Sequence, residues 1–244
     1  MSGRASTDSI IVAAIGDLHV SEHRETAYDA MFAEISEAAD VVALCGDLTN
    51  FGKVKEAEIL AEDLRALTIP AVAVLGNHDV EAGQTQEVLE IFEQAGLTML
   101  DEEAVVIEGV GFAGVKGFLG GFGRAELGAF GEPAVKSFVD EARNEARKLE
   151  NALRSLRTDR AVAVLHYAPV ADTVVGEPLE IYPFLGSSRL ANAIDRFENV
   201  KAVVHGHAHR GSYRGSTPRG VPVYNCAQYV VEAEFQRRYA LLEI

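Results

Sequence analysis

Five short apolar segments of this 244-residue sequence each lead into a block that contains Asp, Asn or His. Glycine stands in four of the blocks, where it lets the backbone turn tightly. If the segments are neighbouring parallel strands, the polar side chains meet at the carboxyl edge, where open α/β sheets bind ligands. The blocks are Gly16-Asp17-Leu18-His19, Gly46-Asp47-Leu48-Thr49-Asn50, Gly76-Asn77-His78-Asp79, His166-Tyr167-Ala168-Pro169 and His205-Gly206-His207-Ala208-His209.

Seven side chains in these blocks could ligate metal ions. Carboxylate, amide and imidazole donors in this mixture suit Mn, Fe, Zn or Co better than Ca or a thiophilic metal. One ordinary site needs fewer than seven donors, whereas two ions that share a bridging carboxylate would use them all. A single Gly-Asp pair or a single His is more simply a turn residue, and only the recurrence after five segments favours a site. The sequence therefore predicts two divalent metal ions as cofactors, with the donors Asp17, His19, Asp47, Asn77, His166, His207 and His209.

The elements that would position these donors follow from the apolar pattern. The segments at 10–15, 41–44, 71–75, 161–165 and 202–204 do not alternate with polar residues, which is typical of strands buried on both faces. Between them, apolar residues recur at helical spacing over 57–64, 88–95 and 135–156. Residues 97–115, 221–227 and 239–244 are expected to be further extended segments, the first of them a meander. The alternation predicts an α/β protein with largely parallel sheets.

In this order, the Asp-x-His, Gly-Asp, Gly-Asn-His-Asp, His and Gly-His-x-His motifs resemble those of the calcineurin-like metallophosphoesterase superfamily, across residues 15–209. The resemblance implies a four-layer α/β/β/α sandwich with a dinuclear metal site between its sheets. It also implies one ion held by Asp17, His19, Asp47 and His209, and another held by Asp47, Asn77, His166 and His207, with Asp47 as the bridge. His78 corresponds to the catalytic histidine that is not a ligand, and Asp79 to its orienting partner.

The reaction implied by this resemblance is phosphoester hydrolysis by a metal-bridging hydroxide that attacks phosphorus directly. His78 would stabilise the phosphoryl oxygens or protonate the leaving alkoxide. Protein phosphatases of the superfamily carry an Arg shortly after the second block, but here that stretch reads Gly46-Asp47-Leu48-Thr49-Asn50-Phe51-Gly52. The set is more similar to the bacterial cyclic-nucleotide phosphodiesterase group, whose second block has Asp where Asn50 stands. We therefore predict a metal-dependent phosphodiesterase that acts on a small phosphoester substrate.

Other functions stay open at this level. The same fold could serve a phosphomonoesterase or phosphoprotein phosphatase, and a metallophosphoesterase-like scaffold could bind a partner without catalysis. The scaffold is disfavoured because all seven donors and His78 are present. The stretch His19-Val20-Ser21-Glu22-His23 matches the pattern of inverted zinc peptidases, but that motif needs a helix to bring both His residues onto one face.

Substrate contacts are expected from residues beside the predicted site, with Asn50, Tyr167 and Arg210 as the candidates. Segment 109–131 holds nine glycines interleaved with Phe, which indicates either a turn-rich connection or a mobile loop beside a pocket. Segment 170–188 directly follows the His166 block and should lie over the metal edge. His205 is expected to be a core residue and not a ligand.

Charge and length limit the partners. Lys and Arg number 22 and Asp and Glu 37, so the net charge is −15 and a nucleic-acid backbone is not the expected partner. A phosphate ester stays compatible, because bound cations reverse the local charge. The length suits a single domain over residues 1–244. The apolar stretch at 10–15 is too short for a signal or a membrane span, so a cytoplasmic protein is expected, and its oligomeric state is left open.

Overall fold

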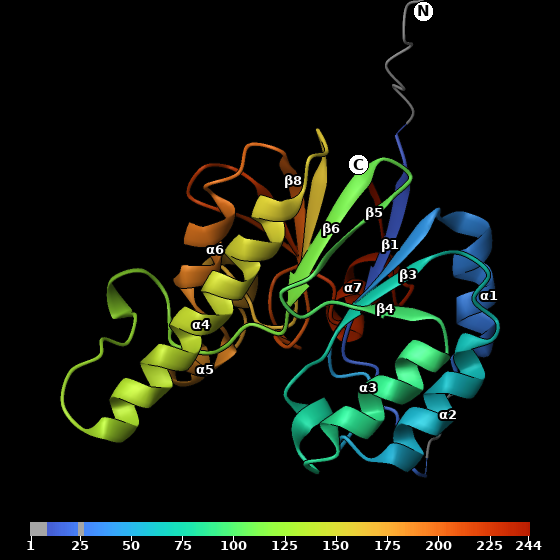
Figure 1. Cartoon of the computed structure of the whole chain (residues 1–244), viewed down its shortest axis with the longest axis horizontal. Helices are drawn as coiled ribbons and strands as arrows, with labels where there is room; N and C mark the ends of the chain where they lie inside the picture. The colour runs from blue at the N-terminus through green and yellow to red at the C-terminus, as the bar shows by residue number, and fades with distance from the viewer. Residues whose placement is uncertain (1–8, 24–26) are drawn as a thin grey trace, which may run out of the picture.

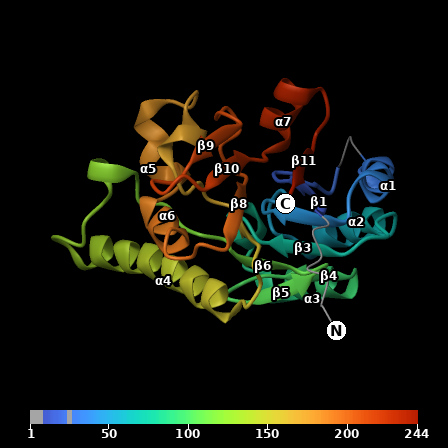
Figure 2. The ribbon, with the colours of Figure 1, turned by 90° about the horizontal axis from the view of Figure 1, so that it is seen from above.

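The computed structural model describes residues 9–23 and 27–244. They form two sheets that pack face to face, with helices covering the outer face of each (Figures 1 and 2). The strand order is β11-β1-β2-β3-β4 in the first sheet and β5-β6-β7-β8-β10-β9 in the second. Inner strands run parallel, and the edge strands β11, β5 and β9 are antiparallel to their neighbours. The predicted four-layer α/β/β/α sandwich is confirmed.

The strands alternate with helices along most of the chain, as the apolar pattern predicts. The first sheet contains β1 (Ile11–Ile15), β2 (Val41–Cys45), β3 (Ala71–Val74), β4 (Leu97–Met99) and β11 (Ala240–Glu243). The second contains β5 (Ala104–Ile107), β6 (Val110–Val115), β7 (Ala161–Leu165), β8 (Val200–His205), β9 (Arg214–Ser216) and β10 (Pro222–Asn225). The helices are α1 (Asp29–Ala38), α2 (Val54–Leu64), α3 (Thr85–Gln94), α4 (Pro133–Ser155), α5 (Tyr182–Leu185), α6 (Ser188–Ile194) and α7 (Gln228–Phe235). Short 3-10 turns are η1 (His78–Val80), η2 (Gly123–Ala125), η3 (Ala171–Val174) and η4 (Leu179–Ile181).

Burial on both faces explains why the central strands are apolar throughout. In β1, Val12 and Ala14 lie in the core between the two sheets, while Ala13 and Ile15 lie in the core under α1, α2 and α3. On the other side, α4 and α6 pack against the outer face of the second sheet. Because neither face of these strands meets water, no polar alternation is expected in them.

The five polar blocks are divided between the sheets. The first three follow β1, β2 and β3 of the first sheet, and the last two follow β7 and β8 of the second. Contacts between the loops join the two carboxyl ends, as when the Gly16 N–H donates to the Cys226 carbonyl at 2.8 Å. The blocks therefore do not line one sheet edge, as the strand pattern alone suggested, but meet where two sheets end side by side.

The expected meander over 97–115 is wrong. Leu97–Met99 joins the first sheet as β4, parallel to β3, whereas β5 and β6 form a hairpin at the edge of the second sheet. The chain crosses between the sheets over residues 100–103, and no local pattern of apolar residues marks that crossing. In the described ranges, every helix is too short or too polar to cross a lipid bilayer.

Candidate metal centre

The candidate site is built on loops with an uncommon backbone conformation. Asp17, His19, Asp47 and His207 have positive φ angles of 63°, 47°, 50° and 70°. Residues other than glycine rarely occupy this left-handed region, and holding them there costs on the order of 1–3 kcal/mol each. Bonds between loops fix them, such as the Asp17 N–H to the Gly46 carbonyl at 3.0 Å. Strain concentrated at four of the predicted donors is typical of a functional site.

Asp17, His19 and His209 form the first group of donors. The Nε2 atom of His209 lies 3.0 Å from Asp17 Oδ1 and 3.3 Å from Nε2 of His19. Asp17 is fully buried, and both of its carboxylate oxygens lie 3.0 Å from the backbone nitrogen of His207. Two imidazole nitrogens and a carboxylate oxygen thus converge on one small volume, as divalent-cation sites require.

The second group brings together Asp47, Asn77, His166 and His207. The Nε2 atom of His166 lies 2.9 Å from Asn77 Oδ1 and 3.4 Å from Asp47 Oδ1. The His207 ring stands edge-on to the His166 ring, with 4.8 Å between the centroids. Donor atoms of Asp47, His166 and His207 lie within 4.8 Å of one another.

Asp47 faces both groups. Its Oδ1 points to His166, and its Oδ2 lies 3.9 Å from Nε2 of His19. A carboxylate that faces two groups of donors in this way could be shared by two cations. The structure therefore brings all seven predicted donors together, and their chemistry and convergence fit two divalent ions.

Hydrogen bonds to carbonyl oxygens decide which imidazole nitrogen is free. Because a carbonyl only accepts, the His166 Nδ1 donates to Cys45 at 2.9 Å and its Nε2 is left with a lone pair. Likewise, the His207 Nε2 donates to the Phe184 carbonyl at 3.1 Å, which leaves Nδ1 as the ring nitrogen with a lone pair. Such bonds orient the rings before any ion binds.

Burial also sets the protonation states. Burial lowers the pKa of His19 to about 4 and that of His207 to about 3, so both rings are neutral at neutral pH. Burial by itself would raise the pKa of Asp17, but the hydrogen bond from His209 and the nearby imidazoles outweigh it and lower that pKa. Neutral imidazole and ionised carboxylate are the forms that bind a metal ion.

Two glycines make room for the donors. A Cβ atom on Gly76 would overlap the carboxylate of Asp47. A Cβ atom on Gly206 would lie 2.6 Å from Asp17 Oδ2, inside van der Waals contact. The glycine of one block thus leaves space for the carboxylate of another, which gives these residues a role beyond turning the chain.

His78 stands beside the donors, but Asp79 does not orient it. The His78 Nδ1 donates to the Asn50 carbonyl at 2.7 Å, and its ring meets the His19 ring edge-on at 4.5 Å. Asp79 is fully buried and accepts hydrogen bonds from the Leu48, Thr49 and Gly76 N–H groups and from the Thr49 hydroxyl. The expectation that Asp79 is the partner of His78 is therefore wrong. Its carboxylate oxygens accept hydrogen bonds that join the loop after β2 to the loop after β3, and none from His78.

The three predicted substrate residues differ in where they lie. Asn50 contributes the carbonyl that holds His78. Tyr167 is only 3% exposed and packs between the His166 and His207 rings and Phe118, so it supports the ligand rings and offers substrate no face, contrary to the expectation. Arg210 is exposed and lines a hollow with His209.

Segment 170–188 pairs with the glycine-rich segment 109–131. The Gly121 N–H donates to the Gly186 carbonyl at 2.9 Å, and the Ser188 N–H donates to the Gly121 carbonyl at 3.1 Å. The carbonyl of Phe184 in α5 holds the His207 ring. Segment 170–188 thus reaches the metal edge as expected. Residues 110–115, where the glycine-rich segment overlaps the extended stretch predicted at 97–115, form strand β6.

Other motifs resolve simply. Residues 18–23 are not helical, so His19 and His23 cannot form a peptidase motif. His205 is fully buried and contacts Thr173 at 2.8 Å, in agreement with a core role. Cys45 and Cys226 are buried free thiols.

Three supporting residues were missed by the sequence analysis. Asn225 donates to the Ala208 carbonyl at 2.7 Å, Gln228 donates to the Asp17 carbonyl at 2.5 Å, and Tyr229 packs 5.0 Å from the His209 ring. Asn225 ends a sixth apolar strand in the same way as the five blocks, and this signal could have identified it. Nothing in the sequence marks Gln228 or Tyr229.

Two hollows adjoin the first group of donors. One, of about 380 Å³, is lined by His19, Tyr229 and Arg238 among others. The other, of about 350 Å³, is lined by His209, Arg210 and again Tyr229. A group bound at the donors therefore has space on two adjacent faces of α7.

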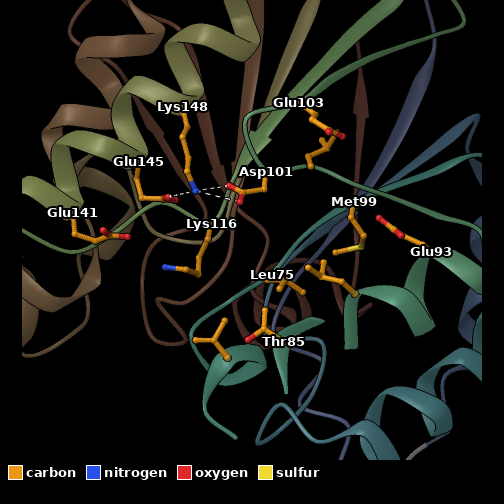
Figure 3. A pocket seen from close by; sticks show the side chains of 13 residues that line it. Leu75, Thr85, Glu93, Met99, Asp101, Glu103, Lys116, Glu141, Glu145 and Lys148 are labelled. Carbon is orange, nitrogen blue, oxygen red and sulfur yellow. Dashed lines mark hydrogen bonds and ion pairs between the residues drawn. The ribbon is translucent and has the colours of Figure 1, made fainter. Parts of the chain in front are cut away.

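A third hollow, of about 290 Å³, lies between α3 and β4 on one side and α4 on the other (Figure 3). Lys148 there pairs with Asp101 and Glu145 at 2.9 and 3.0 Å. Lys116 points away from these carboxylates, and burial lowers its pKa. The hollow is lined by none of the seven donors.

Lys116 nevertheless supports the metal edge. Its Nζ lies 5.4 Å from the centroid of the Tyr167 ring, and its backbone carbonyl accepts the N–H groups of His166 and Tyr167 at 3.1 Å. The Lys116 ammonium group therefore makes a cation–π contact with the Tyr167 ring, which itself packs against His166 and His207.

The sequence matches the family model described as calcineurin-like phosphoesterase over residues 10–211. A protein of Arcobacter nitrofigilis named probable glycerophosphodiester phosphodiesterase GpdQ is 23% identical over 219 residues, which cover 83% of this chain and 73% of that protein. The uncharacterised protein MJ1162 of Methanocaldococcus jannaschii is 25% identical over 184 residues, 72% of each chain.

Among solved structures, the phosphopantetheinyl hydrolase PptH of Mycobacterium tuberculosis superposes with a TM-score of 0.62 at 15% identity, covering 96% of this chain and 95% of that one. At this identity the likeness concerns the fold alone.

Proposed function

Since the chain belongs to the calcineurin-like phosphoesterase family and is thus a metal-dependent phosphoesterase, we propose that it hydrolyses phosphodiesters of small organic substrates. The observation that carries the diester proposal is the pair of hollows beside the first donor group. A phosphodiester carries two organic groups on phosphorus, and the two hollows give each of them a place.

Charge supports the same choice. Among the residues that the structure describes, Arg210 is the one Lys or Arg that lines the hollow beside His209, and Arg238 is the one that lines the hollow beside His19. A diester carries one negative charge, whereas a monoester carries nearly two at neutral pH and calls for a denser cation cluster. The relative from Arcobacter, named a probable phosphodiesterase, points in the same direction.

The seven donors would hold two divalent ions, with Asp47 shared between them. When bound, the ions supply Lewis acidity toward the phosphoryl oxygens and lower the pKa of water. The protein contributes rings that are already oriented, by Cys45 for His166 and by Phe184 for His207. It also contributes His78, whose Nδ1 is committed to the Asn50 carbonyl, so that Nε2 would donate to a phosphoryl or leaving-group oxygen when the ring is the imidazolium and carries a proton on both nitrogens.

The test compares bis(p-nitrophenyl) phosphate with p-nitrophenyl phosphate, using chelated protein reloaded with Mn, Fe, Zn, Co or Mg. We expect that adding metal restores turnover, and that kcat/KM is at least tenfold higher for the diester than for the monoester. The Asp140→Asn variant, altered on the exposed surface of α4, serves as the matched control and should behave as the parent protein. A preference for the monoester would contradict the proposal, and no turnover with any metal would favour a binding scaffold.

A further inference from the structure

Tyr229 occupies a place that the reaction proposed above does not yet explain. It is the second residue of α7, its side chain is 47% exposed, and it lines both hollows beside the metal centre. Its ring lies 5.0 Å from the ring of His209 at a tilt of 45°. An aromatic side chain that is half in solvent and one ring contact from a predicted metal ligand is within reach of a group bound in either hollow.

Hydrogen bonds made by the residue before Tyr229 hold this part of the backbone in place. The preceding residue, Gln228, is buried and donates its backbone N–H to the Gly16 carbonyl at 3.1 Å and its side-chain amide to the Asp17 carbonyl at 2.5 Å. The start of α7 is thereby tied to the loop that carries the first donor. A ring held in this way contacts a ligand with little loss of conformational freedom.

The chemistry of the ring limits what it would bind. An exposed aromatic face attracts another flat π system by stacking. A saturated group of equal size gains only the free energy of burying its apolar surface. Other groups in the hollow beside His19, such as Ser21, Gln228 and Arg238, are polar and could hold the atoms around such a ring. Base–tyrosine stacking of this kind tolerates different bases, because each base has a π face.

Resting on the proposed diesterase function, we propose that Tyr229 is a specificity-determining residue that stacks on a planar aromatic ring, such as a nucleobase, carried by the ester group that remains on phosphorus. The preferred substrates are then phosphodiesters in which one organic group is a nucleoside or an aryl alcohol.

The experiment uses esters with one common leaving group. The p-nitrophenyl diesters of phenyl, cyclohexyl and thymidine 5′-phosphate release the same nitrophenolate and differ only in the group that stays on phosphorus. We compare the parent protein with Tyr229→Ala, Tyr229→Phe and the control Phe235→Ala. Phe235 is an exposed aromatic residue of the same helix, and its side chain lines neither hollow. Bound metal is measured for each.

In the parent protein, kcat/KM should favour the phenyl ester over the cyclohexyl ester. Tyr229→Ala should reduce this ratio about tenfold, mainly through KM, and lower kcat/KM for the thymidine ester by a similar factor. Tyr229→Phe keeps the ring and should keep the ratio within about twofold, as should Phe235→Ala. Metal content should stay that of the parent protein.

Three results would overturn the inference. The ratio could be the same in Tyr229→Ala as in the parent protein. Tyr229→Phe could lose as much as Tyr229→Ala, which would assign the contact to the hydroxyl. Tyr229→Ala could lose metal and slow all esters equally, which would make Tyr229 only a support for His209. If the reloaded parent protein hydrolyses none of the esters, the diesterase function itself fails, and this outcome is recognised without any variant.

Discussion

The Nδ1 atom of His78 lies 2.7 Å from the backbone carbonyl oxygen of Asn50. Because the carbonyl can only accept, the proton is on Nδ1 when the ring is neutral, and Nε2 is the atom left to face a substrate. The bond comes from the main chain, so the identity of residue 50 does not decide the orientation of His78. A difference from the phosphodiesterase group at this position therefore leaves His78, the proposed catalytic histidine, in place.

Replacing His78 separates catalysis from metal binding. His78→Ala should lower kcat on a phosphodiester about 10²–10³-fold, because the site loses the imidazole whose protonated form would donate from Nε2 to the phosphoryl or leaving oxygen. Metal analysis should still find the content of the parent protein, since all seven donors are kept. Asp140→Asn, on the exposed surface of α4, is the control, and its kcat should stay within about threefold of the parent value. Unchanged turnover in His78→Ala would remove this residue from the mechanism.

Removing the shared carboxylate should empty the site. Asp47→Asn keeps the shape but lowers the charge between the two donor groups, which Asp47 faces with one oxygen each. We expect metal content by elemental analysis to fall from two ions per chain to one or none, with nearly all activity lost. Asp140→Asn is the control for loss of one carboxylate charge. Two ions per chain in Asp47→Asn would contradict a bridging role.

Gly76 is predicted to be irreplaceable for steric reasons. In Gly76→Ala the new Cβ overlaps the Asp47 carboxylate, which must shift away from one donor group. Metal affinity, measured by titration of chelated protein with Mn, should fall by about 10–100-fold. Gly128→Ala is the matched control, because a Cβ there meets open space without positive φ, and its affinity should match that of the parent protein. Equal affinities in the two variants would show that the loop after β3 relaxes.

Asp79 is predicted to act on stability. In Asp79→Ala the N–H groups of Leu48, Thr49 and Gly76 lose their acceptor inside the protein. We expect the free energy of unfolding to fall by about 3 kcal/mol or more, and the melting temperature by roughly 6–12 °C in chelator. Thr49→Val removes a single side-chain partner and should cost about 1–2 kcal/mol. A melting temperature within a degree or two of the parent value would show that water replaces the carboxylate.

The chemistry of the site could be predicted from the sequence because it depends on residue type and on the local order of apolar runs and polar residues. Apolar runs such as 41–44 indicate strands buried on both faces. The polar residue after each run indicates the strand end at which α/β sheets bind ligands. The donor residues are named by type alone, since carboxylate, amide and imidazole groups bind the same cations wherever they lie. The seven predicted donors therefore follow from residue type and position along the chain, whereas the four-layer sandwich was implied by the resemblance of the ordered motifs to a known superfamily.

Tertiary structure decided everything that depends on contact between distant segments. That Asp79 binds the loop of Thr49 and not its neighbour His78, and that Tyr167 is covered, follow from how two sheets end side by side. The place of Tyr229 at the metal edge depends on α7 docking against the loop of Asp17, more than 200 residues earlier in the chain. Side-chain type and spacing state what a residue can do, but burial and partners are set by packing between elements, which local sequence does not encode.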